Sequence, residues 1–394
     1  MAHILPPFAT DAQAREGLRT RAAAGKAWLT QAALPLWSAN GFDHTARCFY
    51  EKLDLSGRPA LGPRRVRVQA RQTAVFAIAG RRGWSGPWRE MVEAGLAVLF
   101  GTAQRPDGGV RHLLDDAGAP LDSRRDLYDL AFVIFALAHA GRSLNRPDLF
   151  AAADAHVAWI EAHWRHPSGG FLEGEVKPIP PRRQNPHMHF FEALLALCEA
   201  TGEAKHIARA GEIFTLFTTR FYDPARGAFP EFFDDDWRAA SGDEGRHAEP
   251  GHHFEWSWLL QRYSALTNTP LHEAAQRMCA FGETFGVDPK RGAARDEIWI
   301  DGAPKSERAR LWPQTERIKA NAALFARTGE PAYANAAAGA FDALTAYLDT
   351  PVPGLWRDQW TADGAFIEEP APASTFYHIF LALDEMARLF EAPA

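Results

Sequence analysis

The sequence predicts an all-α protein whose 394 residues form one closed ring of about six helix pairs, an (α/α)6 barrel. Turn-rich segments containing Asp, Pro and Gly recur roughly every 55–65 residues. Amphipathic helical patterns precede these segments, and two helices of ordinary length fit between successive turns. Because one helix pair cannot bury its apolar face alone, stacking and closure of the pairs supply the core.

The expected elements follow one another in a regular order. Helical periodicity is expected over residues 11–37, 65–79, 88–100, 151–164, 207–221 and 332–348. The turn segments begin at Gly41, Arg105, His166, Tyr222, Val287 and Thr350. We expect short hairpins at one end of the ring, where loops and helix N-termini line a central cleft.

An open solenoid of helix pairs is the alternative to a closed ring. The repeating units differ in sequence and their turns are rich in aromatic residues, which favours closure. No linker or low-complexity segment interrupts the chain, so residues 1–394 are expected to form a single catalytic domain.

Charge and hydropathy argue against two classes of partner. The formal net charge is -6 without a strongly basic block, so no nucleic-acid partner is expected. No apolar run of about 18 residues is apparent, so no membrane span is expected. The chain has 13 Trp and 26 Phe, side chains that fill a core or stack on sugar rings.

The cysteines and the start of the chain indicate the compartment. Cys48, Cys198 and Cys279 are far apart and form no redox or metal motif, so we expect buried thiols in a reducing compartment. Residues 1–8 lack the pattern of a signal peptide. We therefore expect a cytoplasmic protein; a homodimer is compatible with the sequence, which does not reveal the oligomeric state.

The stretch 250–260 (PGHHFEWSWLL) combines ionisable and aromatic side chains at the start of an expected helix. His252 and Glu255 are three residues apart and share one helix face. Aromatic neighbours such as Trp256 can hold the pKa of an imidazole near neutrality, which suits proton transfer. The alternative is a buried histidine that only makes a structural hydrogen bond.

Other titratable residues also follow turns at expected helix starts. His189 and Glu192 repeat the His-x-x-Glu spacing, and His378 begins the last helix. Glu316 follows a proline at another helix start, and Arg71 is a charge within an apolar helical run. Each has a structural alternative, namely an ion pair or a first-turn acid that favours the positive end of a helix. In a ring, these side chains would face the same mouth.

Metal and nucleotide sites have weaker support. Three histidines and two glutamates could ligate zinc or manganese, but no metal-binding spacing is present and we expect no metal. No glycine-rich phosphate loop indicates a nucleotide, so no cofactor is expected.

Six segments together resemble the N-acylglucosamine 2-epimerase family, which includes mannose isomerases and cellobiose epimerases. The matching segments are 69–72 (QARQ), 126–132 (DLYDLAF), 185–193 (NPHMHFFEA), 250–256 (PGHHFEW), 311–316 (LWPQTE) and 376–378 (FYH). The resemblance implies a six-fold barrel of paired helices that moves protons at C2 of a monosaccharide without a redox cofactor or an obligatory metal.

The resemblance also implies roles for individual residues. The paired catalytic histidines fall on His252 and His378. The sugar-contacting arginine, a third histidine and the acids fall on Arg71, His189, Glu255 and Glu316. We also expect Asn185, Trp256 and Trp312 to contact the substrate. The segment 185–193 carries a second histidine, His187, so the third family histidine is His187 or His189.

We expect His378 to take the proton from carbon and His252 to act as its acid–base partner, with Glu255 orienting His252. Arg71 would polarise the carbonyl oxygen, while His189 and Glu316 would hold hydroxyl groups. Trp312 and Trp256 would form apolar walls.

The expected reaction converts D-mannose into D-fructose through an enediolate. The alternatives are a 2-epimerase acting on N-acylglucosamine, glucose/mannose or cellobiose, and a mannose 6-phosphate isomerase, since arginines lie near the matched segments. A glycoside hydrolase using Asp126, Asp129 or Glu316 and a non-catalytic helical-repeat scaffold are more remote.

Overall fold

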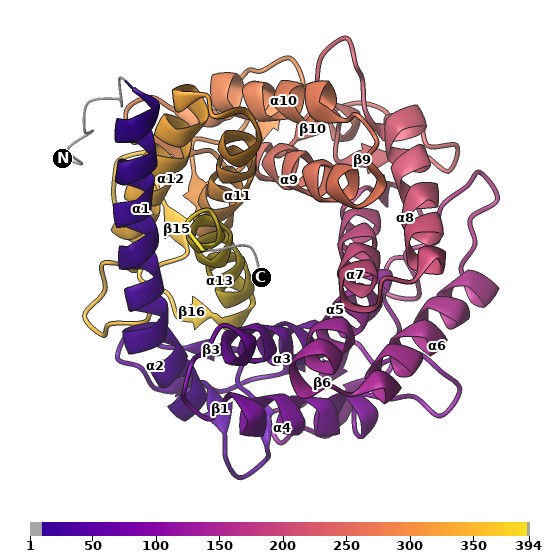
Figure 1. The fold of residues 1–394 in the computed structure, drawn as a ribbon. Coiled ribbons are helices and arrows are strands. Elements are labelled where there is room, and N and C mark those ends of the chain that lie inside the picture. Colours follow the sequence, from indigo (N-terminus) through magenta and orange to yellow (C-terminus); the bar gives the residue numbers. More distant parts are fainter. Residues whose placement is uncertain (1–9, 392–394) are drawn as a thin grey trace.

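The computed structural model describes residues 10–391, which form two concentric layers of helices around one axis (Figure 1). The start of the chain, where no signal peptide is expected, lies outside these residues. The inner helices are α3 (Val66–Arg81), α5 (Leu127–Leu144), α7 (Asn185–Thr201), α9 (Pro250–Thr267), α11 (Leu311–Thr328) and α13 (Ala373–Arg388). The outer helices are α1 (Asp11–Trp28) with α2 (Leu34–Ala39), α4 (Trp88–Phe100), α6 (Pro147–His163), α8 (Ala204–Leu216), α10 (His272–Phe281) and α12 (Pro331–Leu348).

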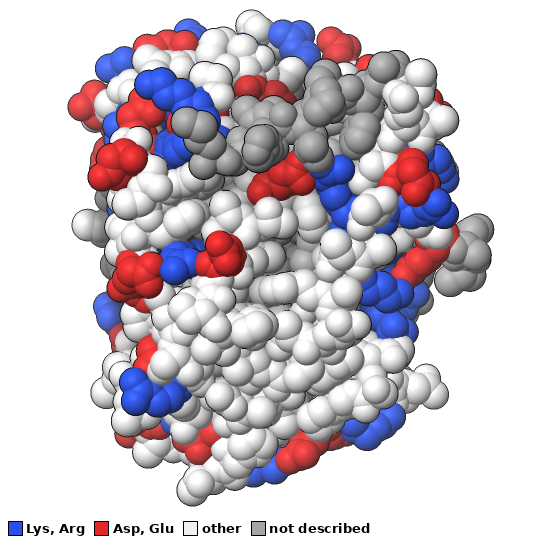
Figure 2. Space-filling model, turned by 90° about the vertical axis from the view of Figure 1, so that its left-hand side faces the viewer, with Lys and Arg blue, Asp and Glu red and all other residues white. Residues whose placement is uncertain are grey.

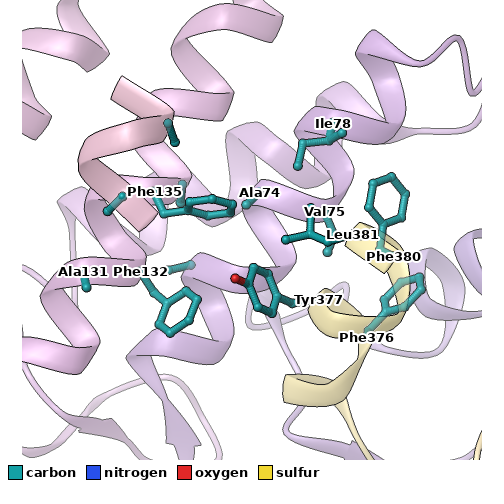
Figure 3. Close-up of a cluster of buried hydrophobic side chains, with 14 of the residues drawn as sticks. Ala74, Val75, Ile78, Ala131, Phe132, Phe135, Phe376, Tyr377, Phe380 and Leu381 are labelled. Carbon is teal, nitrogen blue, oxygen red and sulfur yellow. The ribbon is translucent and has the colours of Figure 1, made fainter. Parts of the chain in front are cut away.

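The ring is closed, as predicted, because α13 packs against α3 as well as against α11. Figure 3 shows the apolar side chains at this seam, which come from α3, α5 and α13. Phe132 and Tyr377 are almost completely buried there, with ring centroids 5.2 Å apart and nearly perpendicular planes. Burial of each such ring contributes about 1.5–3 kcal/mol, so joining the first and last units supplies stability that an open solenoid lacks.

The predicted helices are present, but three outer helices depart locally from α-helical geometry near their C-terminal ends. The expected helix 11–37 contains a π-helical turn at Leu29–Ala33, and π-helical turns also follow α8 (Phe217–Phe221) and α10 (Gly282–Gly286). Pro35 lies directly after the first of these turns and has no amide hydrogen for the regular helical ladder.

Short antiparallel strands join the units at one end of the barrel, and most of the predicted turns form hairpins or isolated bridges. The Thr350 segment forms a bend instead. The pairs are β1 (Phe42–Asp43) with β2 (Cys48–Phe49), β8 (Arg182–Arg183) with β9 (Phe232–Phe233), β10 (His247–Ala248) with β13 (Ile298–Trp299), β11 (Val287–Asp288) with β12 (Ala293–Ala294), and β14 (Ala309–Arg310) with β15 (Gln359–Trp360). The three-stranded sheets are β16 (Ala371–Pro372), β3 (Lys52–Leu53) and β4 (Pro59–Ala60), and β5 (Arg64–Arg65), β6 (Leu113–Leu114) and β7 (Pro120–Asp122).

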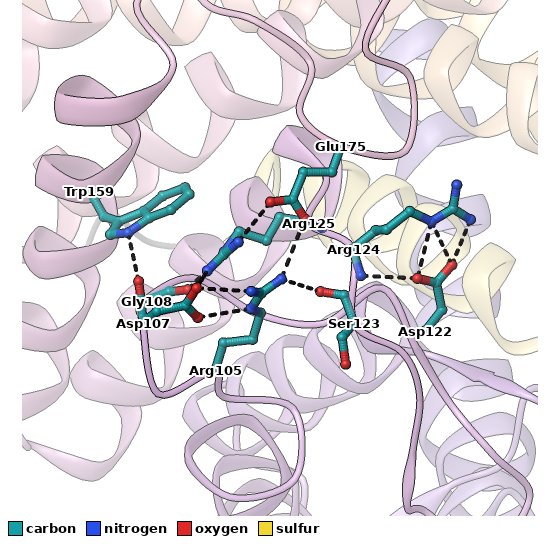
Figure 4. A network of polar contacts seen from close by, with 9 residues as sticks. All are labelled: Arg105, Asp107, Gly108, Asp122, Ser123, Arg124, Arg125, Trp159 and Glu175. Carbon is teal, nitrogen blue, oxygen red and sulfur yellow. Dashed lines mark hydrogen bonds and ion pairs between the residues drawn. The ribbon is translucent and has the colours of Figure 1, made fainter.

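Ion pairs connect the loops of neighbouring units. Figure 4 shows Arg125 between two loops, where it contacts Asp107 at 2.6 Å and Glu175 at 2.7 Å. Arg105 also contacts both acids. Exposed pairs contribute little individually, but Arg125 is buried and its guanidinium has fixed partners. The network therefore holds two loops in register at the hairpin end.

Two features of the structure concern the expectations that the protein has no nucleic-acid partner and no membrane span. On the face drawn in Figure 2, blue basic and red acidic side chains are interspersed, and the described residues form no continuous basic surface there. By length and composition α5 could cross a membrane, contrary to the expectation that no such run exists. It is an inner helix, and 72% of its 18-residue window is buried inside the barrel.

Candidate active site

A cavity of about 500 Å³ opens at the hairpin end of the barrel, where the inner helices begin. Its wall includes seven of the nine residues predicted for the site: Arg71, Asn185, His189, His252, Glu255, Trp312 and His378. They come from α3, α7, α9, α11 and α13, so residues distant in sequence share one space. The first turns of α7, α9 and α11 hold Asn185, His252 and Trp312, whereas Arg71 and Glu255 lie about one turn deeper.

Two carboxylates determine the protonation state of His252. Its Nδ1 lies 2.9 Å from Glu231 Oε2 and 3.8 Å from Glu249 Oε2. Burial works against a charged imidazole, but these carboxylates outweigh it and raise the pKa of His252 to about 9. His252 is therefore an imidazolium at neutral pH.

The amide of Asn185 contacts the other nitrogen of His252, with 3.1 Å between Nδ2 and Nε2. Asn185 Oδ1 is buried and lacks a partner among the described residues. A charged imidazole donates from both nitrogens, so Asn185 accepts through Oδ1 when its amide group is turned over. Asn185 thus helps to fix the ring that faces the cavity.

His378 has the opposite electrostatic environment. Its Nδ1 lies 2.8 Å from Glu316 Oε1. Burial lowers the pKa of His378 well below the usual value, and the positive charges of Arg71 and Lys319 lower it further. His378 is a neutral imidazole whose Nδ1–H donates to Glu316, which leaves the lone pair on Nε2.

Lys319 lies behind this histidine, in a fully buried ion pair with Glu316 at 2.5 Å. Its ammonium also sits 3.9 Å from the ring centroid of Trp258. Burial opposes the charge of Lys319, but Glu316 and Glu255 raise its pKa. Burial raises the pKa of Glu316, and Lys319 counteracts that rise.

Trp312 lies between the two histidines. Its ring centroid is 4.9 Å from that of His252 and 5.8 Å from that of His378. The indole is only partly buried and lines the cavity, as expected for an apolar wall. Both imidazoles therefore face the same small volume, separated by one aromatic side chain.

Arg71 supplies a positive charge to the cavity. It donates from Nη2 to the hydroxyl of Tyr128 at 2.7 Å and from Nη1 to the carbonyl of Ser374 at 3.3 Å. Its guanidinium stacks on Phe132, with Cζ 4.0 Å from the ring centroid. No carboxylate of the described residues pairs with it, so its charge is available to an oxygen of a ligand.

His189 and Glu255 form the remaining polar wall. His189 Nδ1 lies 3.1 Å from Glu192 Oε2 and 4.0 Å from Glu255 Oε1. Burial lowers the pKa of His189 to about 4, so its ring is neutral. Burial and the nearby Glu316 raise the pKa of Glu255 well above the usual range. A protonated Glu255 can donate a hydrogen bond to a hydroxyl group.

Three expected roles are wrong in the structure. Glu255 does not orient His252, because Glu231 occupies Nδ1, Asn185 contacts Nε2, and Glu255 lies near His189 instead. Glu316 does not line the cavity; it lies behind His378 and cannot hold a sugar hydroxyl there.

Trp256 is the third correction. It is completely buried, donates to Gln184 at 2.7 Å and stacks on Phe217. The Trp at this position belongs to the contact between inner and outer helices rather than to the cavity wall.

The structure separates His189 from the other candidate histidine. His187 is buried beside the hairpin, where its Nε2 accepts from the backbone amide of Phe171 at 3.0 Å. His253 likewise accepts from Phe229 at 3.2 Å. Both anchor loops, whereas His189 lines the cavity.

Several groups of donors could hold a metal ion. His189, Glu192 and Glu255 form one group, and Glu231, Glu249 and His252 form another, with ligand atoms within 4.8 Å of one another. Glu255, Glu316 and His378 form a third. In each group, histidine Nδ1 faces a carboxylate, which also suits a tautomer-fixing hydrogen bond.

Sequence reasoning missed Glu231, Glu249 and Lys319. Lys319 follows Glu316 by three positions on one helix, so helical spacing could have indicated this pair. Glu249 precedes His252 by three residues, but it lies before the helix starts. Glu231 is 21 residues from His252 on a loop, and no local pattern connects them.

Comparison with known proteins identifies the family of this chain. The family model of N-acylglucosamine 2-epimerase (GlcNAc 2-epimerase) matches residues 48–382. The chain is 43% identical to a mannose-6-phosphate isomerase of Rhizobium meliloti, over 91% of this chain and 95% of that protein. It is 30% identical to a D-mannose isomerase of Thermobifida fusca, over 93% and 95% of the two chains.

Solved structures show the same fold. The cellobiose 2-epimerase of Spirochaeta thermophila superposes with a TM-score of 0.85 at 20% identity, covering 95% of this chain and 98% of that chain. The predicted (α/α)6 barrel is therefore confirmed. The chain belongs to the N-acylglucosamine 2-epimerase family and is an enzyme of the sugar isomerase and epimerase class.

Proposed function

We propose that the enzyme converts D-mannose into D-fructose: His378 moves a proton from C2 to C1, and His252 exchanges protons with the oxygens on these carbons. The carrying observation is that one charged imidazole and one neutral imidazole line the same cavity. Two relatives carry the names D-mannose isomerase and mannose-6-phosphate isomerase, which supports a mannose-configured substrate. Neither the glycoside hydrolase nor the scaffold alternative agrees with membership of this family.

His378 is the proposed carbon base. Its Nδ1–H is held by Glu316, so Nε2 presents a lone pair toward the cavity. This nitrogen takes the proton from C2 of the open-chain aldose, and the electron pair of the C–H bond forms the C1–C2 double bond. His378 then returns the proton to C1.

His252 is the proposed acid. The imidazolium gives a proton to the carbonyl oxygen on C1 while C2 loses its hydrogen, which produces a neutral enediol. The resulting imidazole accepts the proton of the C2 hydroxyl as C1 is protonated, so a C2 carbonyl forms and His252 recovers its charge. Glu231 stabilises the charged ring at the start and end of the cycle.

Arg71 and Glu255 hold the reacting chain. The guanidinium of Arg71 lacks an acidic partner among the described residues and stabilises negative charge that develops on a sugar oxygen. A protonated Glu255 donates to a hydroxyl group, while His189 offers a neutral imidazole. Trp312 covers the apolar face of the sugar.

Isomerase and epimerase chemistry differ in the carbon that receives the proton. Incubation of D-mannose in deuterated water, followed by NMR of the products, identifies that carbon directly. We expect D-fructose with deuterium at C1 and loss of exchange in His378→Gln. D-glucose labelled at C2 as the main product would contradict isomerisation and support an epimerase.

Mannose 6-phosphate is a second candidate substrate, favoured by one feature of the cavity mouth. Lys52 lines the cavity and has no acidic partner in the described part of the chain. Arg308 and Arg310 both contact Asp296, and Arg310 also lies 3.8 Å from Glu249. We nevertheless prefer D-mannose as the substrate. Arg65 and Arg67, which also line the cavity, are already paired with carboxylates and so have less charge to offer a phosphate group.

Two substrates and one variant separate these candidates. If the phosphate is recognised, kcat/KM is higher for mannose 6-phosphate, and Lys52→Ala lowers only that value. If mannose is the substrate, Lys52→Ala leaves kcat/KM for mannose within about twofold, since surface cations contribute little to a neutral ligand.

A further inference from the structure

A second cavity, which we call the distal cavity, lies at the opposite end of the barrel and has a volume of about 290 Å³. It is lined by the C-terminal parts of α3, α5, α7, α9 and α13, whereas the active cavity is lined by their N-terminal parts. Arg81 lies ten positions beyond Arg71 on α3, about 15 Å further along the helix. The two cavities are therefore separate.

The distal cavity has more cationic than anionic groups. Its acidic residues already have arginine partners: Asp384 and Glu391 contact Arg82, Glu199 contacts Arg262, and Glu385 contacts Arg388. Two arginines that line the cavity, Arg81 and Arg142, have no ion pair with any described residue. Because Arg82 pairs with two acids, the five arginines and four acids of the lining leave a net positive charge of about one, which favours an anion.

Hydrogen-bond donors without acceptors lie in the same wall. Arg81 Nη1 and Trp258 Nε1 are buried and have no partner among residues 10–391. A buried donor without an acceptor costs about 1–3 kcal/mol, and in native proteins such groups usually have a ligand, an ion or water. A ligand that only accepts hydrogen bonds would satisfy both donors.

The pKa shifts in the distal cavity also favour an anionic ligand. Burial and the neighbouring charges of Arg142 and Arg82 lower the pKa of Arg81 to about 10. Burial and the positive charge of Arg81 lower the pKa of His139, which also lines the cavity, well below the usual value. Cationic groups therefore repel one another here, and an anion between them would relieve that repulsion.

We propose that the distal cavity binds a small phosphate-bearing anion through Arg81 and Arg142. The forked guanidinium groups bind two phosphate oxygens at once, and a carboxylate has too few oxygens for both arginines and Trp258. Trp258 donates to a third oxygen, and Phe135 covers an apolar side of the ligand. This site is independent of the reaction at the other end of the barrel.

Calorimetric titration of the full chain with inorganic phosphate tests the proposal, with sodium chloride at equal ionic strength as the blank. We expect binding to one site by the unmodified protein. Affinity should fall about tenfold in Arg81→Met and again in the double variant with Arg142→Met, because each change removes charged hydrogen bonds. Arg220→Met, at an exposed arginine outside both cavities, should bind as the unmodified protein does.

Two further titrations identify which cavity binds phosphate and which kind of anion the site prefers. Lys52→Ala removes a cation of the active cavity and should not change phosphate binding, and acetate should bind much more weakly than phosphate. If Arg81→Met does not fold, Arg142→Met at the rim carries the test. Unchanged affinity in the arginine variants, loss in Lys52→Ala, or equal binding of acetate would each overturn the proposal.

Discussion

His252 and His378 line the same cavity, yet the protein holds His252 as a cation and His378 as a neutral ring. His252 has two carboxylates near Nδ1, which raise its pKa to about 9. Burial lowers the pKa of His378 well below the usual value, and the nearby charges of Arg71 and the buried Lys319 lower it further, although one carboxylate contacts the ring. The comparison shows that the balance between burial and the charges around each ring sets its protonation state, and the proposed acid and base roles follow from that state.

The largest expected effect comes from the proposed base. His378→Gln should lower kcat by about 10²–10⁴-fold, the usual contribution of a general base, and should abolish deuterium exchange at carbon. Steady-state rates and NMR exchange measure both. His187→Gln is the matched control, because His187 anchors a loop and does not line the cavity. Exchange that persists in His378→Gln would assign the carbon base to another residue.

Removing the proposed acid should have a similar but smaller effect on turnover. His252→Gln should lower kcat about 10²–10³-fold, since Arg71 still stabilises charge on the sugar oxygen. The double variant with His378→Gln should be little worse than His378→Gln alone, because the two residues act as one unit. If the loss of kcat in the double variant equals the product of the losses in the two single variants, the two residues do not act as one unit.

The buried lysine should control the tautomer of His378. In Lys319→Met, Glu316 loses its counter-charge, its pKa rises, and the protonated acid no longer accepts from Nδ1–H. We expect kcat to fall about 10–100-fold and the folded state to lose about 3–5 kcal/mol. The pair Lys319→Met with Glu316→Gln should recover stability without activity, as measured by denaturant unfolding. Normal turnover in Lys319→Met would show that Glu316 holds His378 without help.

The pH dependence should reflect His252. This imidazole keeps its proton below a pKa of about 9, so activity should persist to that pH and fall as pH rises through it. Glu231→Gln removes a carboxylate that raises this pKa, so the alkaline limb of kcat/KM should move toward neutral pH. Glu244→Gln, at an exposed acid, should leave the profile unchanged. An unmoved limb in Glu231→Gln would assign it to another group.

Metal removal should have the smallest effect. The donor groups around the cavity are already engaged in tautomer-fixing hydrogen bonds, and the proposed steps require no metal. Dialysis against EDTA should leave kcat within about twofold. A loss of activity that zinc or manganese restores would contradict this expectation.

The sequence predicted the fold well because its signals are local and repeated. Proline- and glycine-rich turns mark the hairpins, and helical periodicity marks the helices. Both histidines follow a turn at a helix start, so ring closure brings them to one mouth.

Contacts between distant loops and helices could not be predicted in the same way. The partner of His252 is Glu231 on a hairpin rather than Glu255 on its own helix, because the path of the loop decides which acid reaches Nδ1. Trp256 and Trp312 both lie within segments that match the family, but helix packing buries Trp256 and leaves Trp312 at the cavity. The donors without acceptors in the distal cavity could not be predicted either, because they result from the way the helix ends pack.

The charges of the two imidazoles are the central claim, and NMR of protein labelled with ¹⁵N-histidine measures them directly. The signals can be assigned by their loss in His252→Gln and His378→Gln. At pH 7.5 we expect His252 to be doubly protonated and His378 to be neutral with its proton on Nδ1. Two neutral rings that titrate alike, or a charged His378 beside a neutral His252, would contradict the account.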